Sequence, residues 1–197
     1  MSRRRSALAL LVSAIALLAA SAAESPTEAV RATLVRAERV VAGDGTREEK
    51  LDALREAARD LFDTGAMGRR AMGDDLDARP PEQQAEFLEL FDEFIVRAYL
   101  QKLLFFRDPR FGYGKEEVSG EEIIVHTVVR TENEDFYVAY AMKRRDERWL
   151  ATDIVVEGVS LTRNYGEQFK SLLRTHSFEE LLDRLRRKVE RLRGEDA

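Results

Sequence analysis

Apolar residues recur at helical spacing along the first third of the chain. Residues 26–42 and 47–62 each carry one apolar face, and Thr46 before the second segment is spaced from Glu49 as in a capping box. Residues 63–76 contain three glycines and are expected to form at most a short helix. The pattern therefore predicts two amphipathic helices followed by an irregular stretch.

Residues 79–106 are predicted to form the longest helix. Pro80 and Pro81 suit its first turn, and the aromatic and aliphatic residues after them cover more than one narrow stripe. A helix with such a wide apolar surface is either buried on two sides or lines a hollow. The pattern alone does not decide between these two possibilities.

The apolar period changes to two in the second half of the chain. Residues 121–130, 135–144 and 148–158 indicate three long strands joined by polar turns, and a shorter strand around 111–119 is expected to complete the meander. Strands joined by such short turns pair antiparallel.

Helical spacing returns after the third long strand. Residues from about 159 to 174 and from about 178 to 192 form the last two predicted helices. Helices thus come first, then an antiparallel sheet, then helices again. This order predicts an α+β fold in which a curved antiparallel β-sheet of about four strands is covered on one face by helices.

Residues 1–23 have the layout of a secretory signal peptide. A basic start precedes an apolar run of 14 residues and a group of small residues, and the run is short for a membrane span, although an uncleaved anchor is the alternative. We expect residues 24–197 to form a single domain, with helices over 26–106, a sheet over about 111–158 and C-terminal helices over 159–192.

The composition excludes several classes of site. The chain has no cysteine, so neither disulfides nor thiolate metal sites are available. After residues 1–23, 29 Lys and Arg stand against 37 Asp and Glu, and this acidic balance argues against nucleic acid as a partner. No second apolar run is long enough to cross a membrane, so the mature chain is expected to be soluble.

Few residues suit catalysis. His126 falls within an apolar strand and His176 in a turn between helices, and no nucleophile, phosphate-loop or metal-binding motif accompanies them. The sequence therefore predicts no metal and no cofactor.

Asp153 is the carboxylate that departs from the surface pattern, because it lies among apolar residues of a strand. Strict alternation places it with Trp149, Ala151, Val155 and Glu157, and the second carboxylate favours an exposed face. A buried Asp153 is the alternative. In a conical fold like that of ketosteroid isomerase, it would serve as a base for proton transfer.

Ten Phe and five Tyr fall largely in the elements that must face one another. The pattern by itself favours an ordinary filled core over a pocket. Export combined with the scarcity of catalytic groups favours the pocket, because a binding protein needs only a cavity.

A resemblance to a known family reverses that order. The string "DIVVEGVSLTRNYGEQF" (153–169), followed by "LLRTHSFEELLDRL" (172–185), resembles the C-terminal signature of the MlaC family. "LFDTGAMGRRAMG" (61–73) and the spacing of Gln83 or Gln84, Glu86, Phe87, Phe91 and Tyr99 are also similar, and together the likeness spans about residues 27–185.

The resemblance implies a function as well as a fold. Members of this family are periplasmic phospholipid-binding proteins of the toluene-tolerance, or maintenance-of-lipid-asymmetry, transport system. The chain is then expected to be a monomeric carrier in the periplasm that encloses a phospholipid in an apolar cavity and shuttles it between an outer-membrane lipoprotein complex and an inner-membrane ABC transporter complex. Other possibilities are a carrier for another apolar lipid such as a hopanoid, an isomerase-like or hydrolytic enzyme of similar shape, and a structural adaptor of the envelope.

The candidate cavity wall follows from the resemblance together with strand alternation, and a slip of one residue would exchange the two faces of a strand. Arg163 and Asn164 are candidate polar groups near the mouth. The candidate lipid-binding residues are Phe91, Phe94, Ile95, Tyr99, Val125, Val138, Tyr140, Ile154, Val156, Val159, Leu161, Tyr165 and Phe169.

The sequence departs from the family pattern at three places. A run of acidic residues follows Gly73 where a Trp is common, and Gly166 stands where a polar residue is common. The segment beyond about residue 186 is additional charged sequence.

Overall fold

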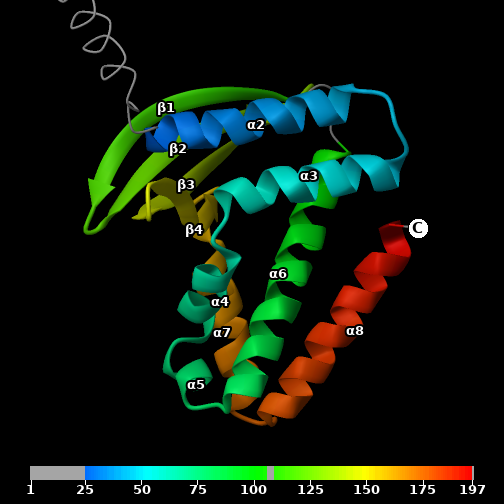
Figure 1. Cartoon of the computed structure of the whole chain (residues 1–197), viewed down its shortest axis with the longest axis vertical. Coiled ribbons are helices and arrows are strands. Elements are labelled where there is room, and N and C mark those ends of the chain that lie inside the picture. Colours follow the sequence, from blue (N-terminus) through cyan, green and yellow to red (C-terminus); the bar gives the residue numbers. More distant parts are fainter. Residues whose placement is uncertain (1–24, 106–108, 197) are drawn as a thin grey trace, which may run out of the picture.

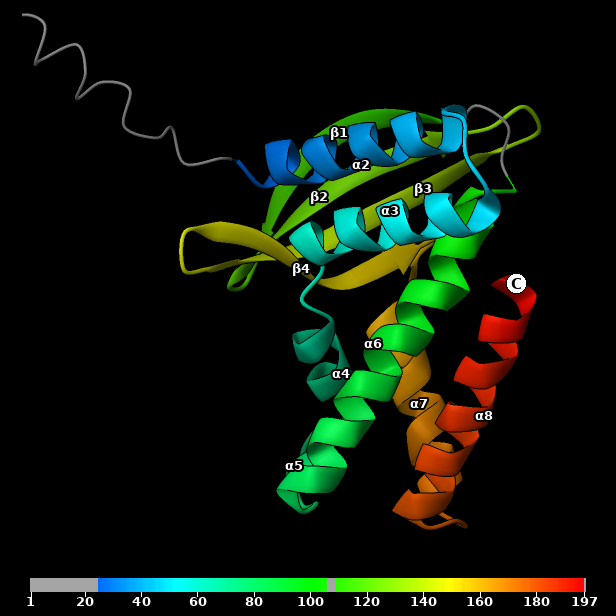
Figure 2. The same ribbon diagram turned by 45° about the vertical axis from the view of Figure 1, so that its right-hand side comes forward.

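The computed structural model describes residues 25–105 and 109–196 of the chain. Within these ranges seven helices and one open, five-stranded antiparallel sheet form the α+β fold that the sequence predicts (Figures 1 and 2). The predicted signal peptide, residues 1–23, lies outside the described residues.

The first two helices, α2 (Pro26–Ala42) and α3 (Arg47–Leu61), form where the apolar pattern predicts them. The side chain of Ser25 caps α2 by accepting a hydrogen bond from the Glu28 amide. Both halves of the capping box at Thr46 are present at the start of α3.

The remaining helices form a bundle below the sheet in the view of Figure 1. They are α4 (Thr64–Met72), α5 (Asp74–Asp77), α6 (Pro81–Leu103), α7 (Leu161–Leu173) and α8 (Phe178–Asp196). The glycine-rich segment after α3 thus forms two short helices, α4 with nine residues and α5 with four. At most one short helix was expected there. Figure 2 shows α8 running alongside α6.

The five strands pair in chain order. They are β1 (Arg110–Ser119), β2 (Glu122–Arg130), β3 (Asp135–Arg145), β4 (Arg148–Val156) and the two-residue β5 (Val159–Ser160). β1 is as long as its neighbours, and β5 was not expected, because residues 159–160 were assigned to the following helix. The turn between β4 and β5 consists of Glu157 and Gly158, both with positive φ, as in the mirror-image turns of two-residue hairpins.

A β-bulge in β4 overturns the strict alternation assumed from the sequence. Ala141 pairs with Asp153 but the next residue of β3, Met142, pairs with Ala151, so Thr152 is an extra residue in β4. Ala151 and Ile154 therefore share one face of the sheet, the face of Tyr140 and Met142, although they are three residues apart. The sequence-based assignment that put them on opposite faces is wrong.

Asp153 is buried, so its expected exposure is also wrong. Its side chain accepts hydrogen bonds from the amides of Ile154 (2.9 Å) and Thr162 (3.0 Å) and from the Ser160 hydroxyl (2.5 Å). Ser160 in turn caps α7 by accepting from the Arg163 amide. The carboxylate joins β4, β5 and the amino terminus of α7, where a negative charge is favoured by the helix dipole.

Two clusters of buried residues hold the fold. The helical core lies among α4–α8, where the ring of Phe87 contacts those of Phe91, Phe169 and Phe178, with centroids 5.6–6.2 Å apart. The sheet core lies between α2, the end of α3 and the inner face of the sheet, and contains Val30, Leu34, Leu61, Val125, Tyr140, Met142 and Ala151.

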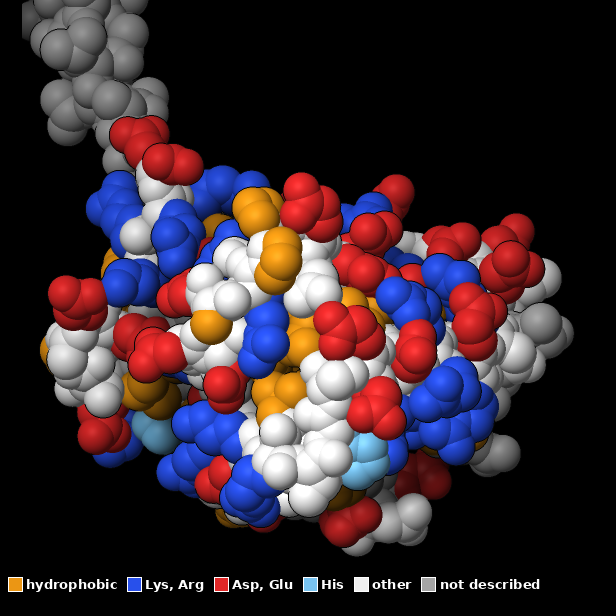
Figure 3. All heavy atoms as spheres, turned by 90° about the horizontal axis from the view of Figure 1, so that it is seen from below, with side chains coloured by type: hydrophobic (Ala, Val, Ile, Leu, Met, Phe, Trp, Pro, Cys, Tyr) orange, Lys and Arg blue, Asp and Glu red, His pale blue; other side chains and the backbone are white. Residues whose placement is uncertain are grey.

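The charged segment beyond residue 186 continues α8 and packs against α6. Val189 and Leu192 are buried, and Arg193 donates to both carboxylate oxygens of Glu93. Arg186 pairs with Glu86 on the same side of the bundle. Seen from the lower end of the bundle, acidic and basic side chains are interspersed around small apolar areas (Figure 3).

Candidate functional site

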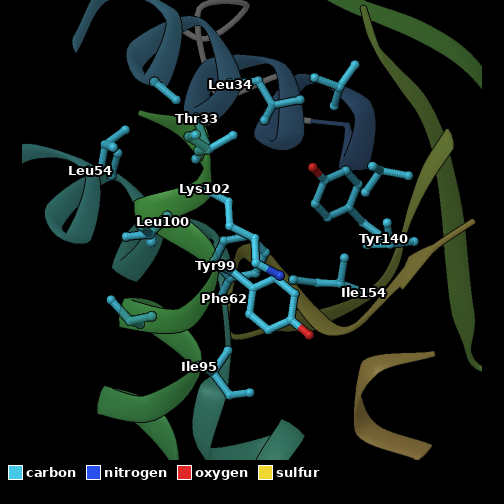
Figure 4. A pocket seen from close by; sticks show the side chains of 18 of the residues that line it. Thr33, Leu34, Leu54, Phe62, Ile95, Tyr99, Leu100, Lys102, Tyr140 and Ile154 are labelled. Carbon is cyan, nitrogen blue, oxygen red and sulfur yellow. The ribbon is translucent and has the colours of Figure 1, made fainter. Parts of the chain in front are cut away.

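An apolar pocket of about 320 Å³ lies between the sheet and the helices α2, α3 and α6 (Figure 4). Its size falls within the range of cavities that hold small-molecule ligands. Its lining residues are Thr33, Leu34, Ala37, Leu54, Ala57, Ala58, Phe62, Thr64, Ile95, Val96, Tyr99, Leu100, Lys102, Leu103, Phe111, Val129, Phe136, Val138, Tyr140, Ile154 and Val156.

Each wall of the apolar pocket comes from an element whose pattern is visible in the sequence. The apolar faces of α2 and α3 present three alanines, Ala37, Ala57 and Ala58, which fill little of the space in front of the sheet. The second apolar stripe of α6 supplies the opposite wall. Ile154 of β4 lies on the same face of the sheet as Tyr140, its cross-strand partner. The wide apolar surface of α6 is therefore explained by both a packed core and a hollow.

Polar groups in the apolar pocket are few and mostly uncharged. Burial raises the pKa of the Tyr140 hydroxyl, so this group stays neutral. Burial also raises the pKa of Tyr165 nearby, and a hydrogen bond to Tyr99 adds to the shift. Lys102 is the single basic residue of the described lining, and its amine lies 4.9 Å from the centre of the Tyr99 ring. Figure 4 shows these two side chains next to each other.

A second hollow, of about 460 Å³, adjoins the apolar pocket at Tyr99 and Lys102. We call it the basic hollow, because Arg47, Lys102 and Lys188 contribute to its wall and its described lining contains no carboxylate. Its full lining is Arg47, Phe94, Ala98, Tyr99, Gln101, Lys102, Phe105, Tyr165, Lys188 and Leu192.

The structure divides the sequence-predicted wall residues among five locations. Six line the apolar pocket: Ile95, Tyr99, Val138, Tyr140, Ile154 and Val156. Phe94 and Tyr165, together with Tyr99, line the basic hollow, and Val125 is buried in the sheet core. Phe91, Leu161 and Phe169 are buried in the helical core. Val159 is 55% exposed on β5 and, like the exposed Arg163 and Asn164, lines neither hollow.

Sequence reasoning missed the contribution of α2 and α3 to the wall. Leu34, Ala37, Leu54 and Ala58 were recognised as the apolar faces of two helices, but not as residues around a cavity. The signal was present, because small residues at Ala37, Ala57 and Ala58 interrupt otherwise bulky apolar faces. Lys102 carries no comparable signal, since a lysine near a helix end is common.

The titratable groups that were considered as catalytic candidates lie outside both hollows. Asp153 is held at the junction of β4 and α7. His126 lies 3.6 Å from the Glu117 carboxylate on the neighbouring strand, and His176 contacts Thr175 and Arg184 next to the capped start of α8. None of the three lines the apolar pocket or the basic hollow.

Comparison with known protein families shows to which family this chain belongs. The family model described as "MlaC protein" matches residues 28–187, which is most of the chain. The chain belongs to the MlaC family. The match ends within α8, so the last residues of the basic hollow, Lys188 and Leu192, lie beyond the part that this MlaC-family chain shares with the family model.

A solved structure has the same fold as this MlaC-family chain. It is the phospholipid-binding protein from Ralstonia solanacearum in complex with a phospholipid, which is 19% identical in sequence and superimposes with a TM-score of 0.77. The similarity covers 85% of this chain and 98% of the Ralstonia protein. None of the curated proteins matches the sequence of this chain. Among the described residues, no helix is both long enough and apolar enough to span a membrane.

Proposed function

We propose that this chain is a periplasmic phospholipid carrier, the soluble substrate-binding component of an ABC-type system that moves phospholipid between the outer and inner membranes. The observation that carries the proposal is the apolar pocket between the sheet and helices α2, α3 and α6, in a chain of the MlaC family. The phospholipid in the similarly folded Ralstonia protein supports the class of ligand.

The free energy of burying an acyl chain is sufficient for carriage through water. Each buried methylene contributes about 0.8 kcal/mol, so ten of them supply about 8 kcal/mol before the costs of association. A dissociation constant of about 1 μM requires a net value of about 8 kcal/mol, so burial of further methylenes must offset the cost of association. An apolar wall of this kind therefore binds a lipid without any covalent step.

The position of Asp153 supports carriage over isomerase-like catalysis. Both carboxylate oxygens accept hydrogen bonds from Ile154, Ser160 and Thr162, and the residue is absent from the lining of the apolar pocket. A buried Asp153 was the reason to consider an enzyme, and its burial is explained by its hydrogen bonds at the start of α7.

The proposed partners follow from membership of the family. The carrier would take lipid from one membrane complex and deliver it to another, an outer-membrane lipoprotein complex and an inner-membrane ABC transporter complex, as a monomer exported by the signal peptide. Co-purification of the transporter complex with the tagged carrier, before and after removal of bound lipid, tests these partners.

Solvent extraction of the purified mature protein, followed by mass spectrometry, tests the ligand. We expect about one phospholipid per chain. Recovery of a hopanoid or another polycyclic lipid instead would replace the ligand class, and a folded protein that carries no lipid and acquires none from vesicles would refute the carrier function.

A variant of the pocket wall localises the site. Val138→Trp places a large ring in the apolar pocket, where the cavity accommodates it, and should reduce the recovered lipid at least about tenfold while the thermal unfolding transition remains. Val118→Trp is the matched control, because Val118 is 78% exposed and lines neither hollow. Equal lipid recovery from both variants would show that the lipid lies elsewhere.

A further inference from the structure

The basic hollow is lined by positive charges, whereas the chain as a whole is acidic. The chain carries a net charge of −5, yet Arg47, Lys102 and Lys188 line one concave surface whose described lining contains no carboxylate. Within the described residues none of these three side chains forms an ion pair with a carboxylate. Three cations that line one recess repel one another, and an anion between them relieves that repulsion.

The basic hollow also adjoins the apolar pocket. Tyr99 and Lys102 belong to both linings, so the polar end of a ligand whose apolar part fills the pocket would lie next to the basic hollow. Lys102 lies next to the Tyr99 ring, and Arg47 lies 5.3 Å from the centre of the exposed Phe105 ring at the rim. Both cations are thus held against aromatic rings at the exit of the pocket.

One wall of the basic hollow lies beyond the match to the family model. Lys188 and Leu192 lie beyond residue 187, where the match to the family model ends. Val189 and Leu192 bury this part of α8 against the bundle, and the pair of Arg193 with Glu93 fixes its orientation relative to α6. Lys188 is therefore positioned by the packing of its helix.

We infer that the basic hollow binds the phosphate of a glycerophospholipid whose acyl part occupies the apolar pocket, and that it favours headgroups with a net negative charge. The inference rests on the proposed function. The phosphate oxygens accept from the guanidinium of Arg47 and the amines of Lys102 and Lys188. A zwitterionic headgroup brings its own ammonium group into the same recess, where the three cations repel it.

Exchange with mixed vesicles tests the inference. The full mature chain is incubated with vesicles that contain equal amounts of phosphatidylglycerol and phosphatidylcholine with identical acyl chains, and the bound lipid is counted by mass spectrometry. We expect phosphatidylglycerol to be enriched. Arg47→Gln combined with Lys188→Gln should lower the ratio of the two bound lipids at least about threefold, and added salt should lower it in the native protein.

Matched variants and free phosphate separate the possible outcomes. Arg187→Gln combined with Arg191→Gln removes two exposed charges from the same helix outside the lining and should leave the ratio unchanged. An equal ratio in the native and Arg47/Lys188 variant proteins would overturn the inference while leaving the carrier function intact. Uptake of neither lipid by any of the proteins would instead refute the carrier function, and the inference with it. Inorganic phosphate that binds by itself, without any preference between the two lipids, would identify a free-anion site and also overturn the assignment.

Discussion

Gly166 of α7 lies against the backbone carbonyl of Ala71 in α4. A methyl group at Gly166 would come within 2.6 Å of that oxygen, closer than a carbon and a carbonyl oxygen approach without displacement of the backbone. The two helices therefore touch at this point because one residue has no side chain. The polar residue that is common at this place in the family pattern would require a different spacing of α4 and α7.

Gly166→Ala should destabilise the protein. The steric cost of about 1–3 kcal/mol exceeds the gain of up to about 1 kcal/mol from replacing a helical glycine. Urea unfolding measures the difference. Gly194→Ala is the control, because a methyl group there meets nothing within 4 Å, and its free energy of unfolding should stay equal or rise slightly. A stable Gly166→Ala protein would mean that α4 and α7 are not in this contact.

Asp153→Asn should lower stability by about 1–3 kcal/mol. An amide has one acceptor oxygen instead of two and brings an NH₂ group toward the donors of Ile154, Ser160 and Thr162. The midpoint of chemical unfolding measures the loss. Asp146→Asn, at an exposed turn position with a positive φ of 46° that asparagine tolerates, should be neutral. An unchanged midpoint for Asp153→Asn would contradict the role of its carboxylate as a cap.

Glu93 should make the attachment of α8 sensitive to acid. Burial opposes the ionised form of this carboxyl, but the hydrogen bonds and charges of Arg193 and Arg97 outweigh burial and hold its pKa below the ordinary value of 4.5. A carboxyl with a lowered pKa in the folded state contributes stability above its unfolded pKa, and that contribution disappears as the pH falls through the folded pKa.

Glu93→Gln should therefore cost about 1 kcal/mol at pH 7, and this cost should shrink as the pH falls below the ordinary pKa of 4.5. Urea unfolding at pH 7 and at a pH below 4.5 gives the two differences. Glu190→Gln is the matched control, since Glu190 pairs with the same Arg193 but is 65% exposed, and it should have little effect at either pH. A pH-independent cost for Glu93→Gln would show that packing, and not charge, holds α8.

The architecture was predictable because its signals are local. The helical periods of α2, α3 and α8, the capping box at Thr46 and the two-residue periods of β2 and β3 each lie within one short segment. Strand β5 was not predictable in this way, because two residues have no period of their own. Its existence depends on the positive φ angles of Glu157 and Gly158, which turn the chain back onto β4.

The wall of the apolar pocket was predictable only in part, because it depends on packing between distant segments. Strand alternation placed Ile154 and Val156 correctly, because the bulge at Thr152 precedes them and exchanges only the faces of the residues before it, such as Ala151. Phe91 and Phe169 have the same apolar character as Ile95 and Ile154, so periodicity could not tell the helical core from the pocket.

Phe91 distinguishes these two environments experimentally. It is fully buried in the helical core, where its ring contacts those of Phe87, Tyr165 and Phe169, and it does not line either hollow.

Phe91→Ala should lower the free energy of unfolding by about 3–5 kcal/mol, because it removes a large buried side chain and leaves a cavity. At a temperature where the variant is still folded, however, it should carry as much lipid per chain as the native protein. Urea unfolding and lipid extraction from the same preparation measure both quantities, and Val138→Trp should give the opposite result, with lipid lost and folding retained. Loss of lipid from folded Phe91→Ala would place this ring in the binding site after all.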